Sequence, residues 1–182
     1  MLGMAAAGYA ISATLRLGEE ESSQRSEIIM AGAVSRIRWA CSHLVFAVLG
    51  PAMALCAGGV LAGLTYGAAV GDIGTQLPSL LGAAMAQLPA IWLMSGITMA
   101  IYGLAPRFTA MTWGVLCAFI AIYVFASLDT GPNWLADLAP FSHTPKMPVE
   151  AFHAAPVVWL VAVTATLYAV GLVALRRRDL RS

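Results

Sequence analysis

The chain has 182 residues, of which 60% are hydrophobic and only 10% are charged, and its formal net charge is +1. Its mean hydropathy of +0.80 places it outside the usual range of soluble domains, in which about 25% of residues are charged. Composition therefore predicts a membrane protein, and no nucleic-acid partner is expected.

The first predicted element, Met1 to Leu15, is apolar but short. A helix of this length extends roughly 22 Å, less than the roughly 30 Å of hydrocarbon in a bilayer. A secretory signal carries positive charge before its apolar core, whereas the first basic residue here, Arg16, comes after it. Either tilt or a thinned bilayer accommodates a short helix, or the chain begins partway through a span. We favour the second reading, in which residues 1–15 are a partial first span.

A charged segment follows. The stretch from Leu15 to His43, "LRLGEEESSQRSEIIMAGAVSRIRWACSH", holds eight of the nineteen Lys, Arg, Asp and Glu residues of the chain. It lacks proline, and Ile29, Ala33 and Ile37 recur at every fourth position. This pattern predicts an amphipathic helix in the region 16–39. One face would lie against the membrane or neighbouring helices, and the other would meet a polar partner.

Long uncharged runs make up most of the remaining chain. Residues 39–71, 73–106, 108–128 and 151–175 contain no Asp, Glu, Lys or Arg. Each run exceeds the length needed to cross a bilayer, and barrel strands would instead alternate polar and apolar residues. The predicted transmembrane helices are 43–66, 80–104, 108–128 and 155–175. The expected fold is an all-α polytopic membrane helix bundle, a single transmembrane domain over residues 1–182 with about five spans.

Within the first of these runs, Gly59, Gly63 and Gly67 are spaced by four residues. Small residues at this spacing allow the backbones of two transmembrane helices to approach closely. We expect them to form a helix-packing face rather than to line a pore.

The basic residues indicate how the chain crosses the membrane. If its N-terminus lies outside, nine of the ten Lys and Arg residues fall on one side, and only Lys146 falls on the other. The positive-inside rule assigns the first side to the cytoplasm. Residues 129–154 then form an extracytoplasmic loop, and residues 176–182 form a cytoplasmic tail.

The sequence offers little catalytic chemistry. It contains no phosphate-binding GxxxxGK[ST] loop, and the uncharged spans argue against an ion-coupled pump. Ser95 with His43 as an intramembrane nucleophile and base is a weak alternative. A zinc site is a further weak alternative, with the candidate ligands His143, His153, Asp137 and Glu150. The three cysteines, Cys41, Cys56 and Cys117, lie in or at the edge of predicted spans. We expect burial for the cysteines, solvated loop residues for the zinc candidates, and no catalytic residue, metal or cofactor.

The charged segment contains a recognisable order of residues. An acidic pair is followed by Arg-x-Glu, by Val-Ser-Arg-x-Arg-Trp and by Ser-His-Leu, which here are Glu20, Glu21, Arg25, Glu27, Val34, Ser35, Arg36, Arg38, Trp39, Ser42, His43 and Leu44. This order, with "GLTYGAAVGD", "LPAIWLMSGITMAIYGLAPR", "APFSHTPKMP" and "RRRD" downstream, resembles permeases of the polyketide-antibiotic or multidrug ABC exporter family. Gln24 stands where the family usually has Gly. Such permeases have two similar six-helix halves, and this chain resembles their C-terminal part.

The resemblance implies a role for the charged segment. In such permeases it carries a cytoplasmic coupling helix that docks on a separate ATPase subunit, and the coupling residues would be Glu20, Glu21, Arg25, Glu27, Ser35, Arg36 and Arg38. The resemblance also implies a cell-membrane location, a hydrophobic drug or polyketide-like substrate, and further transmembrane helices or a second permease half as partners. The chain by itself would not be an enzyme.

Two other readings stay open. The segment could be a surface helix whose charges only fix topology. The protein could also be a non-transporting membrane scaffold or assembly protein that recruits a cytosolic partner.

Overall fold

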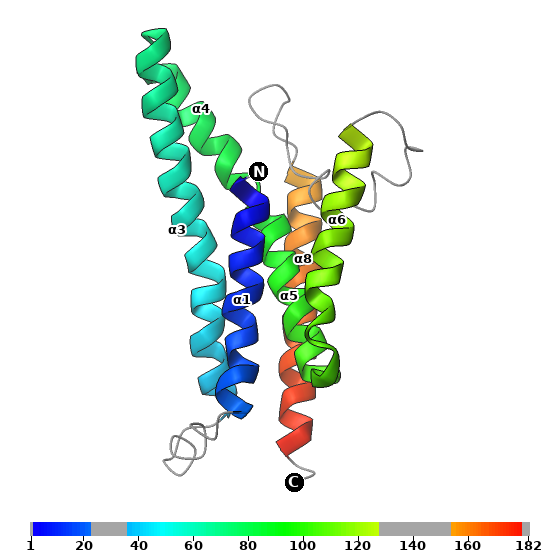
Figure 1. The fold of residues 1–182 in the computed structure, drawn as a ribbon. Coiled ribbons are helices and arrows are strands. Elements are labelled where there is room, and N and C mark those ends of the chain that lie inside the picture. The colour runs from blue at the N-terminus through cyan, green and yellow to red at the C-terminus, as the bar shows by residue number, and fades with distance from the viewer. Residues whose placement is uncertain (1, 23–35, 128–153, 180–182) are drawn as a thin grey trace.

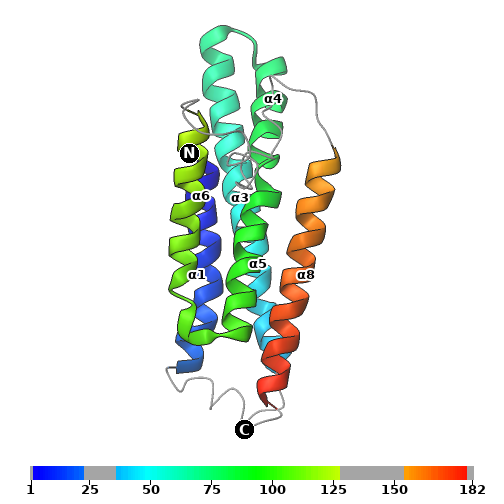
Figure 2. The same cartoon turned by 90° about the vertical axis from the view of Figure 1, so that its right-hand side faces the viewer.

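The computed structural model describes residues 2–22, 36–127 and 154–179, and these residues confirm the predicted all-α class. The helices are α1 (Leu2–Ser22), α3 (Arg36–Val70), α4 (Ile73–Met85), α5 (Leu88–Leu104), the 3-10 helix η1 (Pro106–Phe108), α6 (Met111–Ser127) and α8 (Ala154–Asp179). They run roughly parallel or antiparallel to one another in an elongated bundle (Figures 1 and 2).

The two longest helical stretches of the chain are α3 and the pair α4–α5. Helix α3 has 35 residues, which corresponds to about 52 Å of helix. The chain turns at Gly71, whose φ of 78° is in the left-handed region that favours glycine. Asp72 then caps α4 by accepting a hydrogen bond of 3.2 Å from the Thr75 backbone N–H. The resulting α3–α4 hairpin projects beyond the ends of α1, α6 and α8 (Figure 1).

Helices α4 and α5 descend together but are interrupted at Ala86 and Gln87. The Gln87 N–H donates to the Ala84 carbonyl at 3.2 Å, which tightens the turn at this point. Pro89 follows in the first turn of α5, where its missing N–H costs little. The predicted span 80–104 therefore corresponds to the end of α4 and all of α5.

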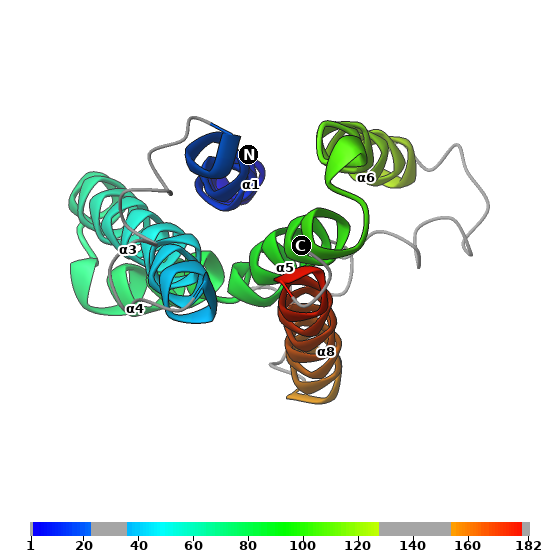
Figure 3. The ribbon, with the colours of Figure 1, turned by 90° about the horizontal axis from the view of Figure 1, so that it is seen from below.

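Helix α5 is the centre of the bundle. Twelve of its seventeen residues are buried, and α1, α6, α8 and the α3–α4 pair surround it (Figure 3). The larger core cluster joins it to the small-residue face of α1, formed by Ala6, Ala7 and Ala10. A second cluster joins Met99 and Tyr102 of α5 to Leu175 of α8.

Three stretches are long and apolar enough to cross a membrane, namely Cys41–Val70, Ile73–Leu104 and Ala155–Arg177. The remaining predicted span, 108–128, contains a shorter apolar helix, Met111–Phe125, because Phe108 belongs to the η1 turn. The ends of the helices also differ from the boundaries between the charged region 16–39 and the apolar segments on either side of it. α1 continues through the first part of the region 16–39 as far as Ser22, and α3 already begins at Arg36, since charged residues do not interrupt a helix.

Candidate functional site at the arginine-bearing end

One end of the bundle collects the described basic side chains. Helix α1 ends there, α3 begins there, η1 turns there and α8 ends there (Figures 1 and 2). We call it the arginine-bearing end, after the described side chains of Arg16, Arg107, Arg176 and Arg177. Asp72, the acidic residue whose side chain the structure describes, lies at the opposite end, in the α3–α4 turn.

The predicted coupling residues fall at this end or outside the described part of the chain. Glu20 and Glu21 lie in the last turn of α1, and Arg36 and Arg38 lie in the first turn of α3. Arg25, Glu27 and Ser35 lie outside the described residues. The backbone thus places four of the seven at the ends of two neighbouring helices, and their coupling role stays a prediction.

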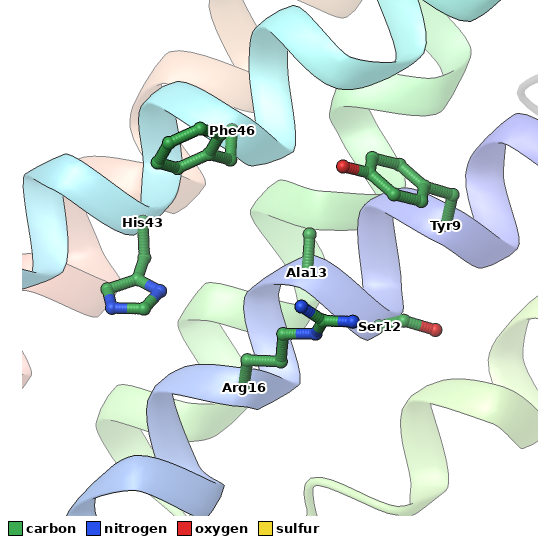
Figure 4. A pocket seen from close by; sticks show the side chains of 6 residues that line it. All are labelled: Tyr9, Ser12, Ala13, Arg16, His43 and Phe46. Carbon is green, nitrogen blue, oxygen red and sulfur yellow. The ribbon is translucent and has the colours of Figure 1, made fainter.

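A pocket of about 260 Å³ lies between α1 and α3 close to this end. Its lining residues are Tyr9, Ser12, Ala13, Arg16, His43 and Phe46. Figure 4 shows His43 and Phe46 on α3 across from the α1 residues. We call this the α1–α3 pocket. The Ser12 hydroxyl is already engaged, because it donates to the Gly8 carbonyl at 3.0 Å.

Residue spacing could not have identified this pocket. In the sequence, Arg16 indicates the topology of the chain, and His43 belongs to the Ser-His-Leu block of the family resemblance and is a weak base candidate for Ser95. The pocket exists because two helices meet, and no motif in the sequence pairs α1 with α3 at this register.

An apolar groove lies on the other side of α3, facing α8. It measures about 430 Å³ and is lined by Cys41, Leu44, Val45, Val48, Leu49 and Tyr168. Its lining has no charged residue. Such a surface suits a hydrophobic molecule or a lipid chain.

Polar contacts inside the bundle join three helices. The Trp92 indole N–H of α5 donates to the Val48 carbonyl of α3 at 3.1 Å. On α5, the Ser95 hydroxyl donates to the Trp92 carbonyl at 2.9 Å and is also hydrogen-bonded to the Tyr168 hydroxyl of α8. Ser95 is therefore a helix-packing residue, and the structure does not bring it together with His43.

The predicted packing glycines face α4. Gly59, Gly63 and Gly67 are buried, and a methyl group added to them would come within 3.0, 2.8 and 2.7 Å of the Cα atoms of Leu81, Leu77 and Ile73. The spacing of four residues thus follows the line along which the two arms of the hairpin touch.

A second close helix contact has no comparable sequence signal. A methyl group on Gly103 of α5 would collide with the Gly171 carbonyl of α8, and one on Gly171 would collide with the Met99 carbonyl. The two backbones therefore touch where α5 and α8 cross. Neither glycine belongs to a series with regular spacing, so the sequence alone does not indicate this contact.

The remaining candidates are easily placed. Cys41 and Cys117 are exposed and Cys56 is partly exposed, so their expected burial is wrong. The outer surface of this bundle is itself apolar, and small apolar residues are therefore not confined to the core. The zinc candidates His143, His153, Asp137 and Glu150 all lie outside the described residues. Among the described residues no cluster could hold a metal ion.

The described helices, with their long apolar stretches and their described basic side chains at one end, define a helical membrane domain. The chain belongs to the family described as "Multidrug efflux system permease Rv1217c, C-terminal domain", which matches residues 1–176. It is 50% identical over 181 residues to the multidrug efflux system permease protein Rv1217c of Mycobacterium tuberculosis (strain ATCC 25618 / H37Rv). That match covers 100% of this chain and 33% of the relative, so the chain spans about a third of the relative's length. The predicted resemblance to the C-terminal part of such a permease is confirmed.

Proposed function

We propose that this chain is the C-terminal part of a permease that exports a hydrophobic drug or polyketide-like compound, driven by a separate ATPase subunit. The observation that supports this most is that α1 ends and α3 begins at the same end of the bundle. Both helices reach the arginine-bearing end, and the predicted coupling region 16–39 includes the end of α1 and the beginning of α3. A force applied to that segment would act on two packed helices at once.

The packing of α1 supports such transmission. Its small-residue face lies in the core cluster with Ile91 and Met94 of α5. Its other side meets α3, where the Tyr9 ring lies against the Cα atom of Gly50. Because packed helices move as units rather than deform, tilting α1 would displace its neighbours.

The charge distribution supports an external energy source. The predicted spans 43–66, 80–104 and 155–175 contain no Asp, Glu, Lys or Arg. Ion-coupled transport places such groups at membrane depth. An ATPase on the arginine-bearing side, which the positive-inside rule assigns to the cytoplasm, would supply the energy instead.

The apolar surfaces of the described helices support the proposed substrate and the proposed further partners. The apolar groove beside α3 offers a hydrophobic compound a surface without charge to desolvate. Large apolar side chains such as Phe46, Met53 and Leu61 are exposed on α3, at 66%, 68% and 64%. Lipid, further transmembrane helices or a second permease half would cover them.

Charge reversal in the coupling segment tests the proposal. In the complete natural permease, expressed with its ATPase, the variants Glu20→Lys with Glu21→Lys, and Arg25→Glu, are expected to lower both retention of the ATPase and efflux of a lipophilic dye by about tenfold, as a lost pair of interfacial charges would. Arg107→Glu is the matched control, because Arg107 is exposed at the same end but lies in η1. Membrane insertion should be unchanged in all variants.

The outcomes are distinct. If the Glu20, Glu21 and Arg25 variants retain the ATPase and export normally, coupling through this segment is wrong. If the Arg107 variant loses export to the same degree, the effect is one of general surface charge and not of the coupling residues.

A further inference from the structure

We propose that the α1–α3 pocket binds the phosphodiester headgroup of an anionic phospholipid from the leaflet at the arginine-bearing end. The proposal does not depend on transport or on an ATPase. It rests on the side chains that α1 and α3 bring together and on where the pocket opens.

Arg16 supplies the recognition of charge. Its guanidinium borders the pocket (Figure 4), and a guanidinium fork matches the geometry of two phosphate oxygens. The Ser12 hydroxyl donates to Gly8 and so is not available as a donor to an anion. His43 adds an imidazole from the opposite helix.

The position of the pocket favours a lipid headgroup. Arg16 is the first charged residue after fifteen uncharged ones, which places it where α1 leaves the hydrocarbon. Tyr9 and Phe46 are 49% and 66% exposed, so the pocket opens on the outer surface of the described bundle and not in its core. A molecule with its charge at Arg16 would have its apolar part beside these two rings.

The size of the pocket is compatible with a headgroup. The cavity of about 260 Å³ can accommodate a glycerophosphate group. Pockets for drug-sized molecules are typically about 300 to 1,000 Å³. The surrounding chemistry therefore fits a small anionic group attached to apolar chains that remain outside.

Site-specific photo-crosslinking tests the proposal. The complete natural permease, carrying a benzoylphenylalanine at Phe46, is placed in bilayers of equal amounts of phosphatidylglycerol and phosphatidylcholine. The control position is Leu64, which is exposed on the same helix far from the pocket. We expect crosslinks at Phe46 to favour phosphatidylglycerol and crosslinks at Leu64 to show no such preference.

Substitutions then identify the group responsible. Arg16→Gln should lower the phosphatidylglycerol preference at Phe46 by about tenfold, the size of one lost charge-assisted hydrogen bond. Arg16→Lys should keep part of it, which shows that the protein still folds. Arg107→Gln removes the same charge at the same end but outside the pocket, where the guanidinium lies 4.6 Å from the centre of the Phe108 ring. It should leave the preference unchanged.

Three results would overturn the proposal. Equal crosslinking of both lipids at Phe46 would mean that the pocket does not select charge. An equal loss in the Arg16→Gln and Arg107→Gln variants would mean that the attraction is diffuse surface electrostatics. Displacement of the lipid by millimolar inorganic phosphate would identify a site for small soluble anions instead.

Discussion

The contact between α5 and α8 is close enough that a single methyl group should disrupt it. At Gly103, an added Cβ would overlap the carbonyl group of Gly171, and at Gly171 it would lie 2.8 Å from the carbonyl carbon of Met99. Both obstacles are helix backbone, which cannot rotate away as a side chain can. The whole of α8 would have to shift, so Gly103→Ala and Gly171→Ala should each cost about 1 to 3 kcal/mol, the range for overpacking a core.

The chain provides a matched control in Gly114. It also lies within an apolar helix, α6, but an added Cβ there would meet nothing within 4 Å. Gly114→Ala should therefore be neutral or stabilise the helix by about 0.5 to 1 kcal/mol through propensity alone. The opposite signs separate a packing effect from a backbone effect.

The measurement is an unfolding titration of the purified permease in mixed micelles, with SDS as denaturant and tryptophan fluorescence as the signal. The two crossing-point variants should unfold at lower SDS fraction than the parent, and Gly114→Ala at the same fraction or higher. If Gly103→Ala is as stable as Gly114→Ala, the backbones of α5 and α8 do not touch as described.

Two other predictions follow from the polar contacts and from the positions of the helix ends. Tyr168→Phe removes the hydroxyl that is hydrogen-bonded to Ser95 and should lower the free energy of unfolding by about 0.6 kcal/mol, the mean for hydrogen bonds between transmembrane helices. In a double-mutant cycle with Ser95→Ala, the two losses of stability should not add. Additive losses would contradict the hydrogen bond. Cysteines introduced at Asp72 and Arg107, in a background without Cys41 and Cys117, should react with an impermeant thiol reagent from opposite sides of the membrane. The cysteine at position 72 should react from outside the cell. Labelling of both cysteines from one side would contradict the predicted topology.

The fold class could be predicted from the sequence because it depends on a simple quantity. A run of some thirty residues without a charge, such as 39–71, cannot remain in water and needs only its own backbone hydrogen bonds in lipid. The ends of the helices could not be predicted in the same way. Leaving the hydrocarbon does not end a helix, so α1 continues to Ser22 through a charged sequence and α3 starts at Arg36.

The pairing of helices was only partly predictable. Gly59, Gly63 and Gly67 indicate that α3 meets another backbone, and a turn as short as Gly71 and Asp72 makes α4 the natural partner. No such connection joins α5 to α8, which lie far apart in the chain. Helix α5 is also buried around most of its circumference, so no periodic polar face shows which side meets which neighbour.

Because the pairing of helices was only partly predictable, Arg16 has one interpretation in the sequence and another in the structure. In the sequence it is a basic residue after an apolar run, which is sufficient to orient a span. In the structure it borders a pocket with His43 and Phe46 of another helix, and this grouping depends on the pairing of α1 with α3. A charge that only orients the chain needs no partner at a defined position, whereas one that binds a headgroup does. The Arg16→Lys and Arg107→Gln comparison separates these roles, because orientation depends on charge alone and headgroup selection also depends on place.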